Sequence, residues 1–231
     1  MQDYSALQQA IGIEIKNEAL LQLAFVHKSY VNEQHGQNIE HNERLEFLGD
    51  AVLELVTTEY LYKNYPKKQE GELTNWRSAL VKGNHLAQVA RELELGKYLS
   101  LSRGEEHSGG RDKPHILANA LEALIGAIFL DRGYRVTHNF IHSLILTNLA
   151  EIIEKGLHID SKSLFQEMAQ GRLGKTPHYT LVSEIGPDHN KIFTMGAYIG
   201  EKCIAEGKGA SKQKAEDTAA REAIKVMGWD S

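Results

Sequence analysis

The sequence predicts a multi-domain protein with an all-α domain in residues 1–154, a linker in 155–160 and a small α+β domain in 161–231. Apolar residues recur at three- and four-residue spacing in segments 19–31, 43–62, 73–95 and 115–130, which is typical of helices that bury one face. After residue 155 the pattern changes to short alternating segments separated by glycine and proline turns, which indicates strands.

Polar, glycine-containing segments separate the predicted helices. YPKKQEG at 65–71 is a stop signal, and SRGEEHSGGRDKP at 102–114 is expected to form an exposed mobile loop. In the second domain, DSKSLFQEMAQ predicts a helix capped by Asp160 or Ser161. HYTLVSEIG, NKIFTMGAYIG and EKCIAEGKG predict three strands, and SKQKAEDTAAREAIKVM predicts a closing helix. The order of the second domain is therefore α-β-β-β-α.

Composition bounds the class of protein. The single cysteine, Cys203, excludes an internal disulfide, favours a reducing compartment and is expected to be a small buried residue. No signal peptide is visible, and no stretch approaches the ~18–20 apolar residues of a membrane span, so we expect a cytoplasmic protein without a membrane partner. The net charge of −5 lies in residues 1–159, because residues 160–231 hold ten basic and ten acidic side chains. Bulk charge therefore does not indicate nucleic-acid binding.

The stretch HNERLEFLGDAVLELV places carboxylates on one face of a predicted helix. At about 100° per residue, Glu43, Glu46 and Asp50 share a face, whereas apolar side chains occupy the other. A solvated acidic face is one interpretation. However, like charges at this spacing cost ~0.2–0.5 kcal/mol per pair, no Lys or Arg lies on the stripe, and Phe47 and Leu53 flank it. An acidic pocket that is buried or lined by an interface, and that binds a cation, explains the unrelieved charge and the apolar neighbours.

The segment HILANALEALIGAIFLD supplies a second polar face. Asn119 and Glu122 lie opposite its leucines, with Gly126 between them, and Gly49 lies beside the carboxylates of the first helix. A glycine within a helix costs ~1 kcal/mol relative to alanine, so the pair suggests a close approach of the two helices. That approach would gather an all-oxygen set suited to Mg²⁺ or Mn²⁺, namely Glu43, Glu46, Asp50, Asn119 and Glu122.

The closing helix begins with a cluster of basic residues. Lys208, Ser211, Lys212 and Lys214 lie at or just before its N-terminus, where cations and free backbone N–H groups can contact phosphates. A capped helix with ordinary surface lysines is the alternative interpretation. His138 and His142, four residues apart, are interpreted as a packed or surface pair.

These segments together resemble the ribonuclease III family. HNERLEFLGDAVLELV resembles its signature segment, and AFVHKSYVNE (24–33), EGELTNWRSALV (70–81) and ILANALEALIGAIFLD (116–131) resemble its other catalytic-domain segments. Residues 161–231 resemble a double-stranded-RNA-binding domain. The arrangement is that of the bacterial type, with one domain of each kind, and it implies an endoribonuclease that hydrolyses double-stranded RNA.

The resemblance implies roles for individual residues. Glu43, Glu46, Asp50 and Glu122 match catalytic acidic positions; Glu46 and Glu122 would be metal ligands, and Asp50 a ligand or a group that orients water. Asn119 stands at a metal-site position where the family commonly has Asp, which predicts weaker cation binding. Glu70 matches a further acidic position near the site. The implied cofactor is Mg²⁺, with Mn²⁺ able to substitute.

The resemblance also implies partners. The family forms a homodimer in which each subunit cuts one RNA strand, and Phe47 matches an aromatic residue that enters the partner subunit. The products would carry 5′-phosphate and 3′-hydroxyl ends with a short 3′ overhang, in ribosomal or messenger RNA processing. In the second domain, duplex RNA would contact Gln166, Glu167, His189, Lys208, Ser211, Lys212 and Lys214, while Gln213 replaces a usual basic residue.

Two other classes of protein remain open from the residues. The first is a catalytically weak or inactive double-stranded-RNA-binding protein on the same scaffold, which the Asn at position 119 favours and the intact glutamates oppose. The second is an acidic helical metal-binding protein unrelated to RNA, which does not account for the C-terminal domain.

Overall fold

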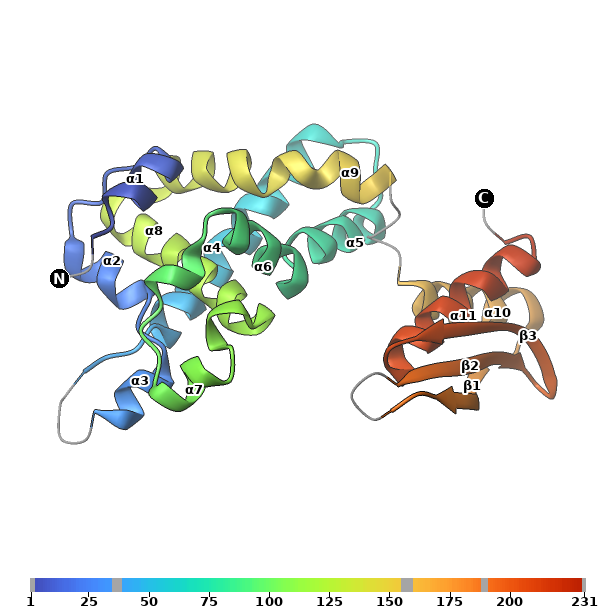
Figure 1. Cartoon of the computed structure of the whole chain (residues 1–231). Coiled ribbons are helices and arrows are strands. Elements are labelled where there is room, and N and C mark those ends of the chain that lie inside the picture. Colours follow the sequence, from blue (N-terminus) through green and yellow to red (C-terminus); the bar gives the residue numbers. More distant parts are fainter. Residues whose placement is uncertain (1–2, 35–38, 155–159, 188–190, 230–231) are drawn as a thin grey trace. The chain divides into compact units, whose positions relative to one another are not determined.

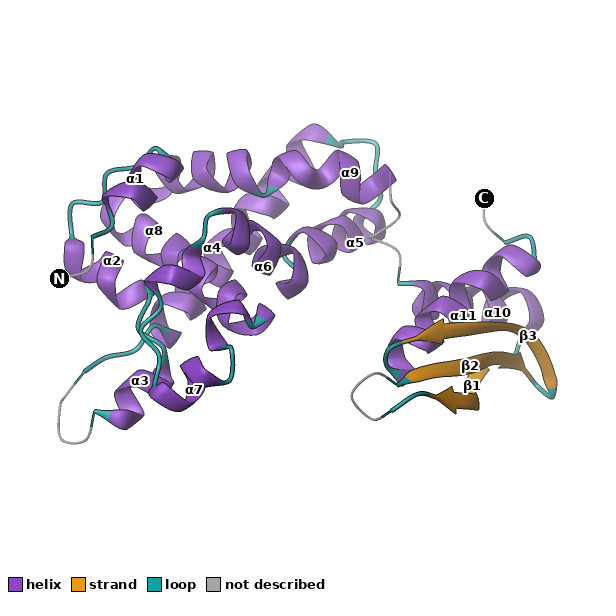
Figure 2. Cartoon of the chain, viewed as in Figure 1, coloured by secondary structure: helices purple, strands orange, loops and turns teal. Residues whose placement is uncertain are grey.

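The computed structural model describes residues 3–34, 39–154, 160–187 and 191–229. The chain divides into two compact units, residues 1–158 and 159–231, and each is considered by itself. Figure 2 shows helices in the first unit and the sheet in the second. The all-α then α+β order is therefore confirmed. The domain boundaries at 154 and 161 stay a prediction, because residues 155–159 of the expected linker lie outside the described residues.

The first unit is built from α-helices and short 3₁₀ turns. Its elements are α1 Ser5–Ile11, α2 Glu18–Ala24, α3 Lys28–Glu33, α4 Glu43–Asn64, α5 Glu70–Leu80, α6 Gly83–Glu92, η1 Leu95–Tyr98, α7 Arg103–His107, η2 Gly110–Asp112, α8 Pro114–Leu144, η3 Leu146–Asn148 and α9 Leu149–Glu154. The longest two, α4 and α8, pack against each other in the middle of the unit (Figure 1). They carry the predicted helices 43–62 and 115–130.

Two predicted helices are each divided in the structure. Segment 19–31 ends as α2 at Ala24 and resumes as α3, because Val26 forms a bridge with Ser100 and the His27 backbone is extended, with ψ of 146°. Segment 73–95 divides at Lys82, whose ψ of 132° ends α5 and precedes α6. These two helix breaks depend on a contact with a distant residue or on the backbone angle of one residue, and neither can be predicted from hydrophobic periodicity.

Segment 102–114, expected to be an exposed mobile loop, is mostly exposed but contains α7 and η2, so its expected loop character was wrong. Ser102 caps α7 by accepting a hydrogen bond from the Glu105 backbone N–H at 3.1 Å. The Arg111 guanidinium donates to the backbone oxygens of Gly96 and Leu99 at 2.8 and 2.9 Å, and Gly110 is buried. This polar segment is folded against η1 because its arginine satisfies the carbonyl groups of that turn.

Helix α8 is the central element of the first core. Its residues from Ile116 to Ile128 are almost all buried. The helical stretch Pro114–Glu154, which begins with α8, is long and apolar enough by length and composition to cross a membrane, contrary to the expectation from the sequence, but 61% of its most apolar window is buried inside the protein. Gly133, with φ of 73° and ψ of 178°, breaks its helical conformation and divides it into two segments. The apolar composition of α8 is that of a core helix.

The second unit consists of α10 Ser161–Leu173, β1 Pro177–Ile185, β2 Ile192–Ile199, β3 Lys202–Gly209 and α11 Lys212–Val226. The strands form an antiparallel sheet in the order β1-β2-β3. Asp160 caps α10 by accepting hydrogen bonds from the backbone N–H groups of Lys162 and Ser163. Phe165 and Trp229 pack with alanines of α11 and with β2 to form the core. Cys203, expected to be buried, is exposed on β3 because its side chain lies on the sheet face opposite this core.

Gly49 determines how closely α4 and α8 approach, so we expect Gly49→Ala to destabilise the first unit. A Cβ atom at this position would lie 1.8 Å from the Glu122 backbone oxygen, which cannot move aside like a flexible side chain. Overpacking of this kind typically costs about 1–3 kcal/mol of unfolding free energy. Urea unfolding measures the change. Gly71→Ala is the matched control, because Gly71 is helical with open space around it. Equal stability of the two variants would contradict this account.

Candidate active site and RNA-binding surface

The acidic residues are positioned by a backbone contact between α4 and α8. A Cβ atom on Gly49 would meet the backbone of Glu122, and one on Gly126 would lie 2.3 Å from the Leu45 oxygen. Each glycine therefore lies against the backbone of the other helix. The predicted close approach is confirmed. Helix α4 is consequently buried on a second side, at Thr57 and at Leu53, and the helical wheel had placed Leu53 beside the acidic stripe.

The crossing brings together polar residues from both helices. Glu46, Asn119 and Glu122 are half-buried, whereas Glu43 and Asp50 are exposed. The Asn119 amide donates a hydrogen bond to the Glu46 carboxylate. The charges of Glu46 and Asp50 both act on Glu122. Four of the five gathered groups are carboxylates, and the fifth offers an amide oxygen or N–H.

Burial and mutual repulsion raise the pKa values of two of these carboxyls. Burial first, and then the negative charges of Asp50 and Glu46, raise the pKa of Glu122 to about 7. The pKa of Glu46 is raised by burial and by the charge of Glu43, and the Asn119 hydrogen bond opposes the shift. The site therefore disfavours its own negative charge unless a cation is present.

Glu43 behaves differently because it has a cationic partner. Lys28 Nζ lies 2.9 Å from Glu43 Oε1, and this hydrogen bond lowers the pKa of Glu43. The lysine comes from α3, so no wheel drawn for α4 alone could reveal it. Within the described ranges of the chain, neither Lys nor Arg forms an ion pair with Glu46, Asp50 or Glu122.

The chemistry of these groups fits a hard divalent cation. Carboxylate and amide oxygens are the ligands that Mg²⁺ and Mn²⁺ prefer. The raised pKa values of Glu122 and Glu46 show negative charge that the protein itself leaves uncompensated. In this conformation the described residues contain no group of three His, Cys, Asp or Glu side chains close enough to hold one ion. A bound cation would therefore have to draw the side chains inward or take water or phosphate oxygens as further ligands.

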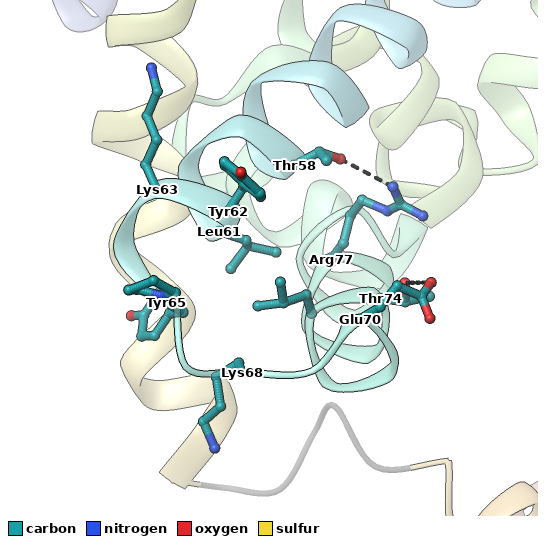
Figure 3. Close-up of a pocket in the computed structure, with 11 residues that line it drawn as sticks. Thr58, Leu61, Tyr62, Lys63, Tyr65, Lys68, Glu70, Thr74 and Arg77 are labelled. Atoms are coloured by element: carbon teal, nitrogen blue, oxygen red, sulfur yellow. Dashed lines mark hydrogen bonds between the residues drawn. The ribbon is translucent and has the colours of Figure 1, made fainter.

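Glu70 lies apart from this cluster in the single chain. It begins α5, is exposed and accepts a hydrogen bond from Thr74 Oγ1 at 3.1 Å. Glu70 lines a pocket of about 690 Å³ (Figure 3), together with Thr58, Leu61, Tyr62, Lys63, Tyr65, Pro66, Lys68, Leu73, Thr74 and Arg77. The Arg77 guanidinium closes one side by donating to Thr58 Oγ1 at 3.1 Å. The pocket lies at the C-terminal half of α4, whereas the acidic cluster lies at its N-terminal half.

An apolar stripe on α4 runs from the acidic end to this pocket. Phe47 is 80% exposed, Leu55 57% and Tyr62 75%. At 100° per residue, the three positions fall within about 80° of one another on the helix. Phe47 was predicted from the sequence as an interface residue, whereas Leu55, Tyr62 and the pocket were not predicted. The spacing of large apolar residues outside the core face was the available signal.

The predicted RNA-binding residues of the second unit lie on its surface. Gln166 and Glu167 are exposed on α10, and Lys208, Lys212 and Lys214 are exposed around the start of α11. Ser211 caps α11 by accepting from the Lys214 backbone N–H at 3.2 Å. None of the three lysines forms an ion pair with another described residue. His189 lies outside the described residues.

Two glycines of β3 bring the strand close to α11. A Cβ on Gly207 would lie 2.1 Å from the Ala219 backbone nitrogen, and one on Gly209 would lie 2.5 Å from that of Ala215. The strand therefore packs directly on the helix, and Lys208, between the glycines, lies on the opposite, exposed face of the strand. Lys212, Lys214, the cap and the free N–H groups of this helix end form a positive surface.

Known proteins resemble both units. Residues 17–149 match the family model described as ribonuclease-III-like, and residues 161–227 match the double-stranded RNA binding motif. The chain is 46% identical over 223 residues to a ribonuclease 3 of Borreliella afzelii, covering 96% of this chain and 91% of the relative. It is 44% identical over 221 residues to a ribonuclease 3 of Desulforamulus reducens, covering 96% and 90%.

A solved structure of the ribonuclease III nuclease domain from Campylobacter jejuni is similar to the first unit. The match has 42% identity and a TM-score of 0.59, and it covers 63% of this chain and 98% of that structure. The description of that structure refers to flexibility in a region involved in dimer formation.

Glu122 makes the stability of the cation-free protein depend on pH. Its folded pKa of about 7 lies above the ordinary value of 4.5, so the folded state binds the proton more tightly than the unfolded state does. The resulting stabilisation is fully present below pH 4.5 and is lost as the pH rises through about 7. We expect Glu122→Gln, which stays neutral, to remove this decline in urea unfolding with EDTA. Parallel pH profiles of the two proteins would contradict the shift.

Proposed function

We propose, since the chain belongs to the ribonuclease III family and is an endoribonuclease of that type, that it cuts double-stranded RNA by divalent-metal catalysis. The observation that carries the proposal is the uncompensated carboxylate cluster at the crossing of α4 and α8. The second unit, with its positive surface, supports a duplex as the substrate. The products would carry 5′-phosphate and 3′-hydroxyl ends.

Each acidic residue has a distinct part in this proposal. Glu46 and Glu122 would hold the cation, Asp50 would bind it or orient a water molecule, and Glu43 would complete the acidic face. Bound Mg²⁺, or Mn²⁺ in its place, would activate the attacking water and stabilise the leaving 3′ oxygen. Because the pKa of Glu122 is about 7, its carboxyl must lose a proton when a cation binds, and cation affinity should rise with pH.

Asn119 would tune this site. Its amide donates to Glu46 and so partly offsets the repulsion between Glu46 and its neighbours. An Asp at the same position would add charge and a further ligand. The asparagine thus lowers the affinity for a cation, and it makes the carboxylate cluster more stable in the absence of metal.

The second unit would hold the duplex by its shape. A-form RNA has a narrow major groove, so proteins contact its phosphates and 2′-hydroxyl groups. Lys212 and Lys214 at the start of α11 would bind phosphates across that groove, Lys208 on β3 would be a further phosphate contact, and Ser211 would fix the helix end. Gln166 and Glu167 on α10, together with His189, would contact minor grooves. At position 213 the chain has Gln in place of the basic residue that is usual in such domains, so one phosphate contact would be missing.

The apolar stripe and the pocket of the first unit support a homodimer. Two α4 helices that pair antiparallel about a two-fold axis near Leu55 would place Phe47 of one copy opposite Tyr62 and Lys63 of the other, because each lies seven or eight residues from Leu55. Phe47 would thereby enter the pocket of Figure 3. Glu70 lines that pocket, so the same pairing would bring it beside the acidic cluster of the second copy.

Such a dimer explains two features together. It covers an exposed apolar stripe that a monomer would leave in water. It also gives Glu70 a place near the site, which the single chain does not. Two acidic clusters on one dimer would allow each copy to cut one strand. We place the activity in cytoplasmic processing of ribosomal and messenger RNA.

Cleavage of a long labelled RNA duplex tests the function directly. We expect the protein to give fragments with 5′-phosphate ends in Mg²⁺ and none in EDTA. Glu122→Ala should abolish detectable cleavage, a larger effect than the roughly 10–100-fold loss typical of removing a group that only supports a metal ligand, yet bind the duplex like the original chain. A duplex that is bound but uncut in both Mg²⁺ and Mn²⁺ would sink the catalytic proposal and support an inactive RNA-binding protein.

Asn119→Asp should lower the Mg²⁺ concentration needed for half-maximal cleavage. An added carboxylate at the cation site is expected to improve affinity about five- to tenfold, equivalent to about 1–1.4 kcal/mol. Titration of Mg²⁺ in the cleavage assay measures it. Asn139→Asp, an exposed change on the far segment of α8, is the control for added negative charge. Identical titrations of the two variants would show that position 119 does not contact the cation.

Phe47→Ala should weaken the dimer. Removing an aromatic side chain from an interface pocket commonly costs at least about 2 kcal/mol, so the dissociation constant should rise by roughly thirtyfold or more. Sedimentation equilibrium provides the measurement. Leu130→Ala removes another exposed apolar side chain, on α8 rather than on the stripe, and should leave the constant unchanged. An unaltered dimer in Phe47→Ala would refute this pairing of α4 helices.

A further inference from the structure

Lys28 is the one lysine or arginine that forms an ion pair with the acidic face in the described residues. It reaches Glu43 from α3, outside both helices that supply the carboxylates. We infer that Lys28 is a built-in counter-ion, a positioning residue that holds Glu43 in the cation-free protein and competes with the incoming divalent cation. This inference rests on the proposed cation site.

The backbone that precedes Lys28 is tied to the start of α4. The Asn42 backbone N–H donates to the Val26 oxygen at 2.9 Å, and the buried Asn42 side chain donates to the Ala24 oxygen at 3.1 Å. Residues next to Glu43 therefore hold the strand-like segment that leads into α3. This connection fixes the backbone from which the Lys28 side chain extends toward Glu43, so the ion pair is supported by backbone hydrogen bonds.

A second set of hydrogen bonds orients the first turn of α3. The His27 ring accepts from the Ser29 backbone N–H at 3.2 Å, and the Ser102 backbone N–H donates to Ser29 Oγ at 3.1 Å. The His27 backbone N–H donates to the Ser100 oxygen at 3.1 Å. Lys28 thus lies between His27 and Ser29, which both form hydrogen bonds through side chain and backbone, while its own side chain remains 60% exposed.

The charges near Lys28 show what its ammonium group offsets. The carboxylates of Glu43 and Glu46 both act on it, and the Glu43 contact raises the pKa of Lys28. His41 Nδ1 lies 3.7 Å from Glu43 Oε2, so it is the other titratable group against this carboxylate, and His27 acts from farther away. One positive charge therefore contacts Glu43 and also acts on Glu46, at the edge of the carboxylate cluster.

Competition follows from linkage. If Lys28 stabilises the carboxylates without metal, then a divalent cation that replaces it binds less tightly than it would in its absence, and the cation must weaken the Lys28–Glu43 pair in return. The released ammonium group would then be free for a phosphate of the RNA. Lysine suits this exchange because its charge is compact and its stem is flexible.

Binding of Mn²⁺ to the full chain without RNA, followed by the EPR signal of free Mn²⁺, tests the inference without reference to cleavage. Exposed ion pairs of this kind change affinity modestly, so Lys28→Met should tighten Mn²⁺ binding about two- to fivefold. Lys28→Arg keeps the charge and should bind like the original chain. Lys97→Met removes a comparable exposed Lys–Glu pair, with Glu94, and should have no effect.

A double-mutant cycle separates a counter-ion from a structural lysine. In a Glu43→Gln background, Lys28→Met should tighten binding by less than it does in the original chain, because the pair is already broken. Equal affinity of Lys28→Met and the original chain overturns the inference, provided that Glu122→Ala abolishes binding. If Glu122→Ala leaves Mn²⁺ binding intact, the cation site itself is wrong and the proposed function fails with the inference.

Discussion

The contact between the backbones of α4 and α8 at Gly49 and Gly126 is the constraint on which the rest of the first unit depends. It can form only where neither helix carries a side chain, since a Cβ atom on either glycine would overlap the opposite backbone. The approach buries Leu53 and Thr57 along with the usual apolar face of α4. It also leaves carboxylates half-buried beside the crossing. The packing that stabilises the fold therefore also places carboxylates close together in a half-buried site, where their negative charges repel one another.

Three different devices relieve that problem. Glu122 retains its proton up to about pH 7, Asn119 donates a hydrogen bond to Glu46, and Lys28 neutralises Glu43. The first and the third would be reversed by a divalent cation, which favours the ionised carboxylate and would replace the proton of Glu122 or the ammonium group of Lys28. Under the proposed function, such exchangeable interactions would let the cluster take up a cation without a rearrangement of the two helices.

The same principle of close backbone approach recurs in the second unit. Gly207 and Gly209 let β3 lie directly on α11, which leaves Lys208 on the exposed face of the strand. In the first unit the glycines bring the carboxylates of two helices together, and in the second they fix the sheet against the helix whose N-terminus carries Lys212 and Lys214. An overall charge of −5 conceals both surfaces, because each is local.

The sequence by itself determined the order of helices and strands, the acidic stripe, the two glycines of the crossing and the basic start of α11. These features follow from periodicity and from residue types at short spacing, so each can be recognised within a single helix or strand. Only the tertiary structure decided that 102–114 is folded, that Cys203 is exposed, that Lys28 contacts Glu43 and that Glu70 lines a pocket away from the acids. Each of these depends on partners far apart in the chain, whose positions follow from packing and hydrogen bonds rather than from local pattern.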